Sequence, residues 1–155
     1  MQPDLKQKVI NIIEKNNVQP SRIKIEVTER LLIENSEIVT KFMDEASSSG
    51  IGFALDDFGV GYSNVEALLN LPFDAIKIDK GLVWTTKGNT QKETFLKALT
   101  YGFHALNRHV VAEGIETKDQ LDFIVECGCD LIQGYYFAKP LLENECLDFL
   151  CGENK

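Results

Sequence analysis

The stretch FALDDFGVGYSN, residues 53–64, joins an apolar run to two adjacent aspartates and a glycine-containing turn. A short apolar run of this kind is typical of a buried β-strand, so the two aspartates stand where the strand ends. Neighbouring carboxylates repel each other unless a positive charge lies between them. The stretch therefore predicts a buried strand whose end presents Asp56 and Asp57 to a divalent cation.

Helical and strand patterns alternate along the chain on both sides of this stretch. Strands are predicted at IKIEVTE, IGFALD, AIKID, HVVAEG and DLIQGYYF, which are residues 23–29, 51–56, 75–79, 109–114 and 130–137. Helical spacing of apolar residues precedes each of them, and ENECLDFLCG, residues 143–152, predicts a last helix. Regular alternation predicts parallel strands covered by helices, so the fold class is α/β.

Two α/β architectures compete. The length of 155 residues favours an open doubly wound sheet, because a complete (β/α)8 barrel needs about 250 residues. The side-chain pattern favours part of a barrel, because each predicted strand carries one polar residue near its C-terminal end. These residues are Glu26, Asp56, Lys77, Glu113 and Gln133. A barrel mouth brings such residues to one level, where they form an active site.

Each of these polar residues also has an ordinary structural interpretation. Glu26 suits an exposed strand, Asp56 or Asp57 a cap, and Lys77 a surface position. Glu113 suits a solvated loop, and Gln133 suits a backbone hydrogen-bond partner. As a set they fit a Mg²⁺ or Mn²⁺ site, because these ions prefer carboxylate and water oxygens. His104 and His109 fall outside the set, and a helix-face or loop position suits both.

Composition limits the classes of function. A hydrophobic content of 44% over this length predicts one domain, and a formal charge of −8 argues against broad binding to DNA or anionic membranes. The sequence shows no membrane-spanning run and no apolar signal-peptide core, which predicts a soluble, cytoplasmic protein. The spacing of the four cysteines departs from zinc motifs, so reduced thiols are expected.

Five motifs together carry a resemblance to a known family. They are EVTE at 26–29, DDFGVGYSN at 56–64, KIDK at 77–80, AEGIET at 112–117 and QGYYFAKP at 133–140. In this order and spacing they resemble the EAL domain family of cyclic di-GMP phosphodiesterases, which is built on a modified (β/α)8 barrel. The resemblance implies that residues 1–155 form a truncated EAL domain comprising about the last five β/α units.

The resemblance also implies a two-metal site for Mg²⁺ or Mn²⁺. Glu26 and Asp56 resemble metal ligands, with Asp56 shared between both ions, and Asp57 resembles a ligand of the second ion. Glu113 resembles the carboxylate on the water side of the site. The implied reaction is hydrolysis of cyclic di-GMP to linear pGpG.

Other motif residues take supporting roles by resemblance. Lys77 resembles the lysine that positions the attacking water, and Gln133 resembles a polar residue near it. Glu29 is similar to the glutamate that anchors the loop after the two aspartates, and Glu116 belongs to the EGIET motif.

The chain departs from the family pattern at several places. The Glu-Ala-Leu motif and a later asparagine ligand have no counterpart, and Val60 and Asn64 stand where threonine and serine are common. An incomplete barrel leaves strand edges unpaired, which predicts a homodimer, a swapped assembly or a complementing N-terminal segment. The family pattern also allows an upstream diguanylate cyclase or sensor domain.

Two other functions compete with an active phosphodiesterase. A catalytically inactive EAL-like module would bind cyclic di-GMP or a protein partner. A barrel enzyme using Lys77 as a Schiff-base nucleophile is a third reading, but it leaves the carboxylates unexplained.

Overall fold

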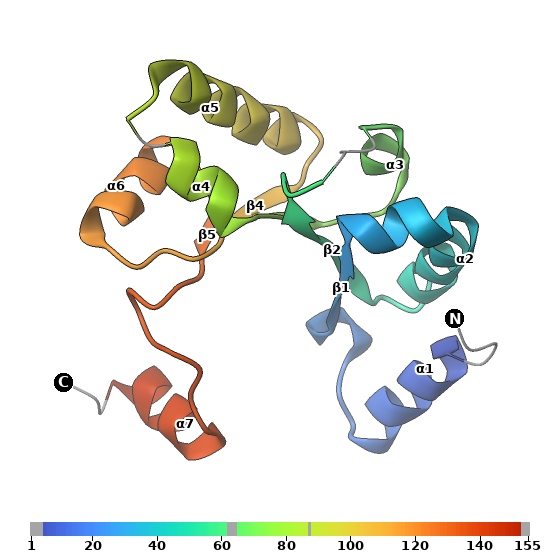
Figure 1. Ribbon diagram of the computed structural model, residues 1–155. Helices are drawn as coiled ribbons and strands as arrows, with labels where there is room; N and C mark the ends of the chain where they lie inside the picture. Colours follow the sequence, from blue (N-terminus) through green and yellow to red (C-terminus); the bar gives the residue numbers. More distant parts are fainter. Residues whose placement is uncertain (1–4, 62–64, 87, 153–155) are drawn as a thin grey trace.

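The computed structural model describes residues 5–61, 65–86 and 88–152. Its strands form one parallel sheet in the order β1-β2-β3-β4-β5 (Figure 1). The strands are β1 Lys24–Thr28, β2 Gly52–Phe58, β3 Ala75–Ile78, β4 His109–Ala112 and β5 Leu131–Ile132. Sequential neighbours in a parallel sheet confirm the predicted α/β class.

A helical segment lies before or between the strands in each unit. The helices are α1 Leu5–Lys15, η1 Pro20–Arg22, α2 Glu29–Ser47, α3 Val65–Asn70, α4 Lys80–Thr86, α5 Thr90–Ala105, α6 Lys118–Glu126 and α7 Glu143–Cys151. The spacing of Thr117 and Gln120 in the sequence predicts a capping box, and it is present at α6, where Thr117 Oγ1 accepts the Gln120 N–H. The spacing of Ser63 and Glu66 predicts a second capping box, but Ser63 lies outside the described residues.

One face of the sheet is apolar and buried, and the other carries polar residues, as the alternation of side chains along a strand predicts. Phe53, Ile76 and Val110 are fully buried in the core that the helices cover. The next residues along β2 and β3, Ala54 and Lys77, point to the opposite face. That face therefore carries the polar strand-end residues, while the helix-covered face holds the core.

Two helices differ from the sequence-based expectation. The stretch NSEIVTKFMDEASSSG, residues 35–50, predicts a helix capped by Asn35 or Ser36, but α2 begins at Glu29 because Thr28 Oγ1 accepts the Leu31 N–H and starts the helix earlier. Asn35 instead has non-helical backbone angles and marks a kink within α2. The sequence patterns predict no helix over residues 80–86, where α4 follows β3 directly.

Strand β5 is also much shorter than the predicted run of residues 130–137. Only Leu131 and Ile132 pair with β4. Beyond Gln133 the chain forms a turn, in which the Phe137 N–H donates to the carbonyl of Gly134 at 3.1 Å and the Tyr136 N–H donates to the carbonyl of Ile115 at 2.9 Å. This turn ends the strand and places Gln133 at its exit.

Helix α7 stands apart from the other helices at the end of an extended connection (Figure 1). All its residues are exposed, including Leu147 and Phe149. Across the ranges that the structure describes, no helix has both the length and the apolar character needed to cross a membrane.

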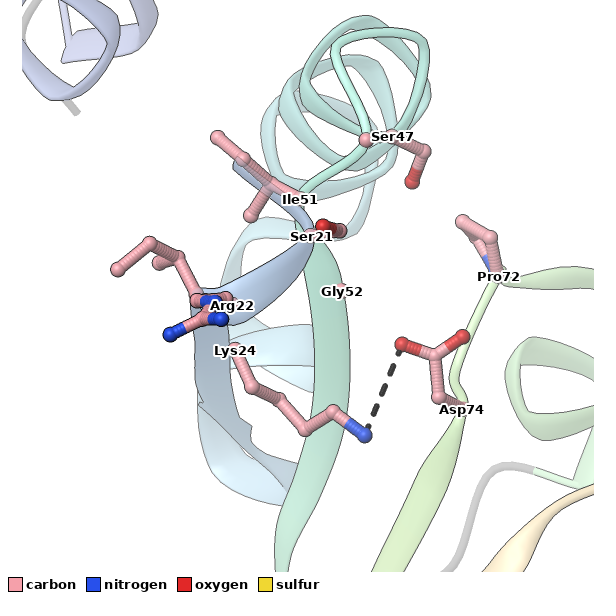
Figure 2. Close-up of a pocket in the computed structure, with 10 residues that line it drawn as sticks. Ser21, Arg22, Lys24, Ser47, Ile51, Gly52, Pro72 and Asp74 are labelled. Atoms are coloured by element: carbon pink, nitrogen blue, oxygen red, sulfur yellow. Dashed lines mark ion pairs between the residues drawn. The ribbon is translucent and has the colours of Figure 1, made fainter. Parts of the chain in front are cut away.

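A hollow of about 410 Å³ lies at the amino ends of β1–β3, the end of the sheet opposite Asp56. Figure 2 shows Lys24 reaching toward Asp74, and their charged atoms are 3.8 Å apart. Asp74 also accepts the Phe53 N–H at 3.0 Å. A side chain at Gly52 would collide with the Asp74 carboxylate, so this glycine admits the contact.

Candidate active site

The side chain of Lys77 lies at the centre of the polar face. Its Nζ is 2.8 Å from Glu26 Oε1, 2.9 Å from Asp56 Oδ1 and 2.8 Å from Glu113 Oε1. These carboxylates come from β1, from β2 and from the end of β4, whereas Lys77 belongs to β3. The parallel sheet therefore brings four of the predicted site residues together, as the barrel-mouth interpretation expected.

The adjacent aspartates reach the same site because the backbone of β2 is irregular. Neighbouring residues of a regular strand point to opposite faces. Asp57 has a left-handed backbone with φ +58°, and the pairing of β2 with β3 shifts between Leu55 and Phe58. This bulge-like irregularity lets Asp57 join Asp56 at the strand end. A left-handed aspartate costs conformational energy, which is typical of functional positions.

Three carboxylates of the site could share one cation. One oxygen from each of Asp56, Asp57 and Glu113 lies within 4.8 Å of the others. Asp56 Oδ1 is buried and has no hydrogen-bond partner among the described residues, so the nearby Lys77 ammonium is its charge contact. A buried carboxylate oxygen without a hydrogen bond suits a metal ligand. The residues therefore fit a divalent cation such as Mg²⁺ or Mn²⁺.

The pKa values of the site show how its charges balance. Burial by itself lowers the pKa of Lys77, but the neighbouring carboxylates of Glu113, Glu26 and Asp56 outweigh it and raise that pKa above its ordinary value. Lys77 therefore stays cationic. Burial and the neighbouring Asp56 raise the pKa of Asp57, which is the carboxyl without an ion pair to Lys77. The site has an excess of negative charge that a cation would relieve.

Gln133 and Glu116 do not contact Lys77 in the described structure, but they line a hollow beside it. This hollow measures about 360 Å³ and is bordered by Asp57 and Glu113 on the side of the carboxylates. Gln133 is exposed at the end of β5. The hollow thus brings these two predicted residues beside Asp57 and Glu113.

Glu29 lies next to the loop that follows the aspartates. Its side chain is buried, and its Oε2 accepts the Gly61 N–H at 3.3 Å. A Cβ at Gly61 would lie 3.3 Å from the same oxygen, so there is little room for a side chain there. Val60 is exposed beside it, while Asn64 lies outside the described residues.

The structure adds residues to this site that the sequence interpretation did not single out. Asp79, Lys80 and Tyr135 border the same hollow. Asp79 caps α4, because its Oδ1 accepts the Gly81 N–H at 2.7 Å. Asp79 and Lys80 lie inside the KIDK motif and Tyr135 lies inside QGYYFAKP, so membership of these motifs was the available signal.

His104 and His109 lie near Asp130 and are not among the residues that meet at Lys77. His104 is on a helix, as expected, whereas His109 is the first residue of β4 and not a helix or loop residue. His104, in the last turn of α5, has Nε2 2.9 Å from Asp130 Oδ2. This pair joins α5 to the segment that enters β5.

The fold and site together define an α/β protein with five parallel strands and an acidic, lysine-centred site at their carboxyl ends. The chain belongs to the EAL domain family, whose sequence pattern matches residues 1–140. The match confirms the predicted resemblance. Helix α7 lies beyond the matched residues.

Relatives and solved structures agree with this membership. The cyclic di-GMP phosphodiesterase RocR of Pseudomonas aeruginosa is 33% identical over 136 residues, which are 88% of this chain and 35% of RocR. A structure of the PaMucR phosphodiesterase with c-di-GMP has 29% identity and a TM-score of 0.85, and the match covers 94% of this chain and 59% of PaMucR.

A manganese and cyclic di-GMP complex of Klebsiella pneumoniae BlrP1 is also similar. It has 29% identity and a TM-score of 0.84 over 90% of this chain and 35% of BlrP1. The five parallel strands therefore match part of the barrel of EAL structures, which confirms the predicted fold. The chain spans 35% of the length of RocR and 15% of the length of NbdA, a second cyclic di-GMP phosphodiesterase of Pseudomonas aeruginosa that it matches.

Proposed function

We propose that this chain is part of a metal-dependent cyclic di-GMP phosphodiesterase, which hydrolyses one phosphodiester bond to give linear pGpG. The observation that carries the proposal is the meeting of Glu26, Asp56 and Glu113 around Lys77, with Asp57 beside them. The relatives suggest the substrate, because RocR is a cyclic di-GMP phosphodiesterase and the PaMucR phosphodiesterase was solved in complex with c-di-GMP.

The carboxylates would hold the cations that this reaction needs. Asp56, Asp57 and Glu113 have oxygens close enough to share an ion, and Glu26 adds a further carboxylate. When bound, Mg²⁺ or Mn²⁺ would lower the pKa of a water molecule and neutralise the phosphate oxygens.

Lys77 would serve the substrate side of the reaction. Its ammonium stays protonated, so it would donate hydrogen bonds to the attacking water and attract a phosphate oxygen. Gln133 and Glu116 would contact substrate in the neighbouring hollow, and Glu29 would hold the loop that follows Asp57 through Gly61.

We further propose that residues 1–155 act as the C-terminal portion of an EAL domain. Strands β1 and β5 pair on one side only among the described residues, and the site lies open at Glu26, whose side chain is 52% exposed. A complementing segment with a Glu-Ala-Leu motif, or a second copy of the chain, would cover these edges. A sensor or diguanylate cyclase domain would supply regulation.

The experiment is hydrolysis of cyclic di-GMP by the purified chain, with Mn²⁺ or with chelator, alone and after addition of an N-terminal EAL segment. The expected result is pGpG formation that needs both Mn²⁺ and the added segment. Glu113→Gln should abolish it, and the matched control Asp122→Asn, which lies on the exposed face of α6, should not. Activity that persists in chelator would contradict the metal-dependent mechanism.

A catalytically inactive binding module remains the second candidate, and the exposure of Glu26 at the edge strand favours it for the chain by itself. It predicts that cyclic di-GMP binds without turnover in every combination. Equilibrium dialysis with labelled cyclic di-GMP, run beside the hydrolysis assay, distinguishes the two functions.

A further inference from the structure

The carboxylate of Glu113 depends on a loop that is held from three directions. The Glu113 N–H donates to the carbonyl of Ile78 at 3.1 Å, which extends the pairing of β3 with β4. Two residues later, the Ile115 N–H donates to the carbonyl of Gln133 at 3.2 Å. Between them lies Gly114, and its carbonyl is held by a side chain from a different element.

That side chain is Trp84 in helix α4. Its indole Nε1–H donates to the Gly114 carbonyl at 2.9 Å across 30 residues of sequence. The indole nitrogen of tryptophan can only donate a hydrogen bond. This bond therefore fixes the orientation of the Trp84 ring and the position of the Gly114 carbonyl. Trp84 is the one tryptophan of the chain.

Lys80, one helical turn before Trp84 on α4, contacts both the Trp84 ring and the loop at Gly114. Its Nζ lies 5.6 Å from the centre of the Trp84 ring, a cation–π distance that is consistent with the i, i+4 spacing on α4. Gly114 has φ +69°, and a Cβ built there would lie 2.4 Å from Lys80 Cβ. The loop can approach α4 this closely only because residue 114 is glycine.

The geometry points to Trp84 as a positioning residue for the metal site, acting through Gly114 on the carboxylate of Glu113. The inference rests on the proposed metal-dependent function. Metal ligands must be held to within a fraction of an ångström, and residues that orient ligands commonly change metal affinity when they are replaced. Trp84 is such an orienting residue, because it holds the loop of Glu113 without being a metal ligand itself.

Metal binding itself tests this role. Free Mn²⁺ is measured by electron paramagnetic resonance during titration of the chain and of Trp84→Phe, which keeps the ring beside Lys80 but removes the N–H. Losing one hydrogen bond is expected to weaken Mn²⁺ binding by roughly two- to tenfold. Tyr101→Phe, which removes a hydroxyl from an exposed aromatic residue of α5, is the matched control and should bind like wild type.

A second measurement needs no variant. Because Trp84 is the single tryptophan, its fluorescence should change during the Mn²⁺ titration with the same midpoint as the resonance signal. Glu113→Gln should remove both responses. A melting temperature of Trp84→Phe within about 2 °C of wild type excludes general destabilisation as the cause.

The outcomes separate the inference from the function on which it rests. Equal Mn²⁺ affinity in wild type and Trp84→Phe, or binding with unchanged tryptophan fluorescence, overturns the positioning role alone. Absence of Mn²⁺ binding in wild type overturns the metal site, and the positioning role with it.

Discussion

Lys77 contacts carboxylates from three different elements, so its charge balances much of the site. Lys77→Met is expected to lower the free energy of unfolding by about 2–4 kcal/mol, because it leaves Asp56 and Glu113 without their cation. The estimate is at the lower end of such losses because Glu26 is half exposed and screened by water.

Thermal unfolding of Lys77→Met with and without Mn²⁺ measures this effect. Added Mn²⁺ should restore part of the lost stability, since it supplies positive charge to the same carboxylates. Lys118→Met, which removes an exposed lysine paired with Asp122 on α6, is the control. A midpoint for Lys77→Met as high as that of the control would contradict the prediction.

Asp56 is the carboxylate whose replacement we expect to lower turnover most. Its Oδ1 is buried without a hydrogen bond, and the same oxygen faces Lys77. In a chain completed by an N-terminal EAL segment, Asp56→Asn should lower turnover of cyclic di-GMP by about two orders of magnitude or more, because a neutral amide is a poor ligand for a hard cation. Steady-state rates at saturating Mn²⁺ test this, and near-normal turnover would disprove the ligand role.

At the scale of elements, Arg108 joins the segment before β4 to the C-terminal end of α3. The buried guanidinium donates to the carbonyl of Leu68 and, at 3.3 and 3.2 Å, to those of Leu69 and Leu71. Burial lowers the pKa of Arg108, which nevertheless stays charged. A cation at a helix C-terminus satisfies carbonyls that have no partner within the helix.

Arg108→Met is therefore expected to destabilise the chain by about 2–3 kcal/mol, because it leaves those carbonyls without their donor. Amide hydrogen exchange should show the largest loss of protection in α3. Arg30→Met, at an exposed position on α2, should leave α3 protected. If Arg108→Met instead lowered amide protection equally in α3 and in the sheet, the Arg108 hydrogen bonds would not stabilise α3 locally.

Asp130 links β4 to the segment that enters β5, and it predicts a pH dependence. Burial by itself raises the pKa of Asp130, but the bond from the Val110 N–H at 2.7 Å and the nearby His104 and His109 outweigh it and hold that pKa below its ordinary value of 3.8. The folded chain thus binds this proton less readily than the unfolded chain. The resulting stabilisation is complete above pH 3.8 and is lost as the pH falls through the lower folded pKa.

Urea unfolding of wild type and Asp130→Asn between about pH 2 and pH 6 measures this contribution. The variant should be less stable than wild type above pH 4, and the difference should shrink at lower pH. Asp148→Asn, on the exposed helix α7, serves as control. A difference that is constant over the whole range would contradict the linkage.

At the scale of the whole molecule, helix α7 contributes little to the stability of the isolated chain. Its residues are exposed, and the family pattern ends at residue 140 before it begins. A chain ending at Pro140 should unfold within about 0.5 kcal/mol of the full chain in urea, because little apolar area is lost. A larger loss would show that α7 packs on the body in solution.

The sequence alone determined the class of the fold and most of the candidate site. Strand patterns at IGFALD and AIKID placed Asp56 and Lys77 on one face, because side chains alternate along any strand. Parallel strands then had to bring Glu26 and Glu113 to the same level. Local signals of this kind depend only on neighbouring residues, so they can be recognised without the folded chain.

Tertiary structure decided the features that depend on distant contacts. The left-handed backbone of Asp57 accompanies the register shift between β2 and β3, and the hydrogen bond from Tyr136 to Ile115 holds the turn after β5 against the segment that follows β4. The hydrogen bond from Trp84 to Gly114 joins residues that no spacing rule connects. Such contacts arise only when elements far apart in sequence pack together, because their energies depend on distance and direction in space.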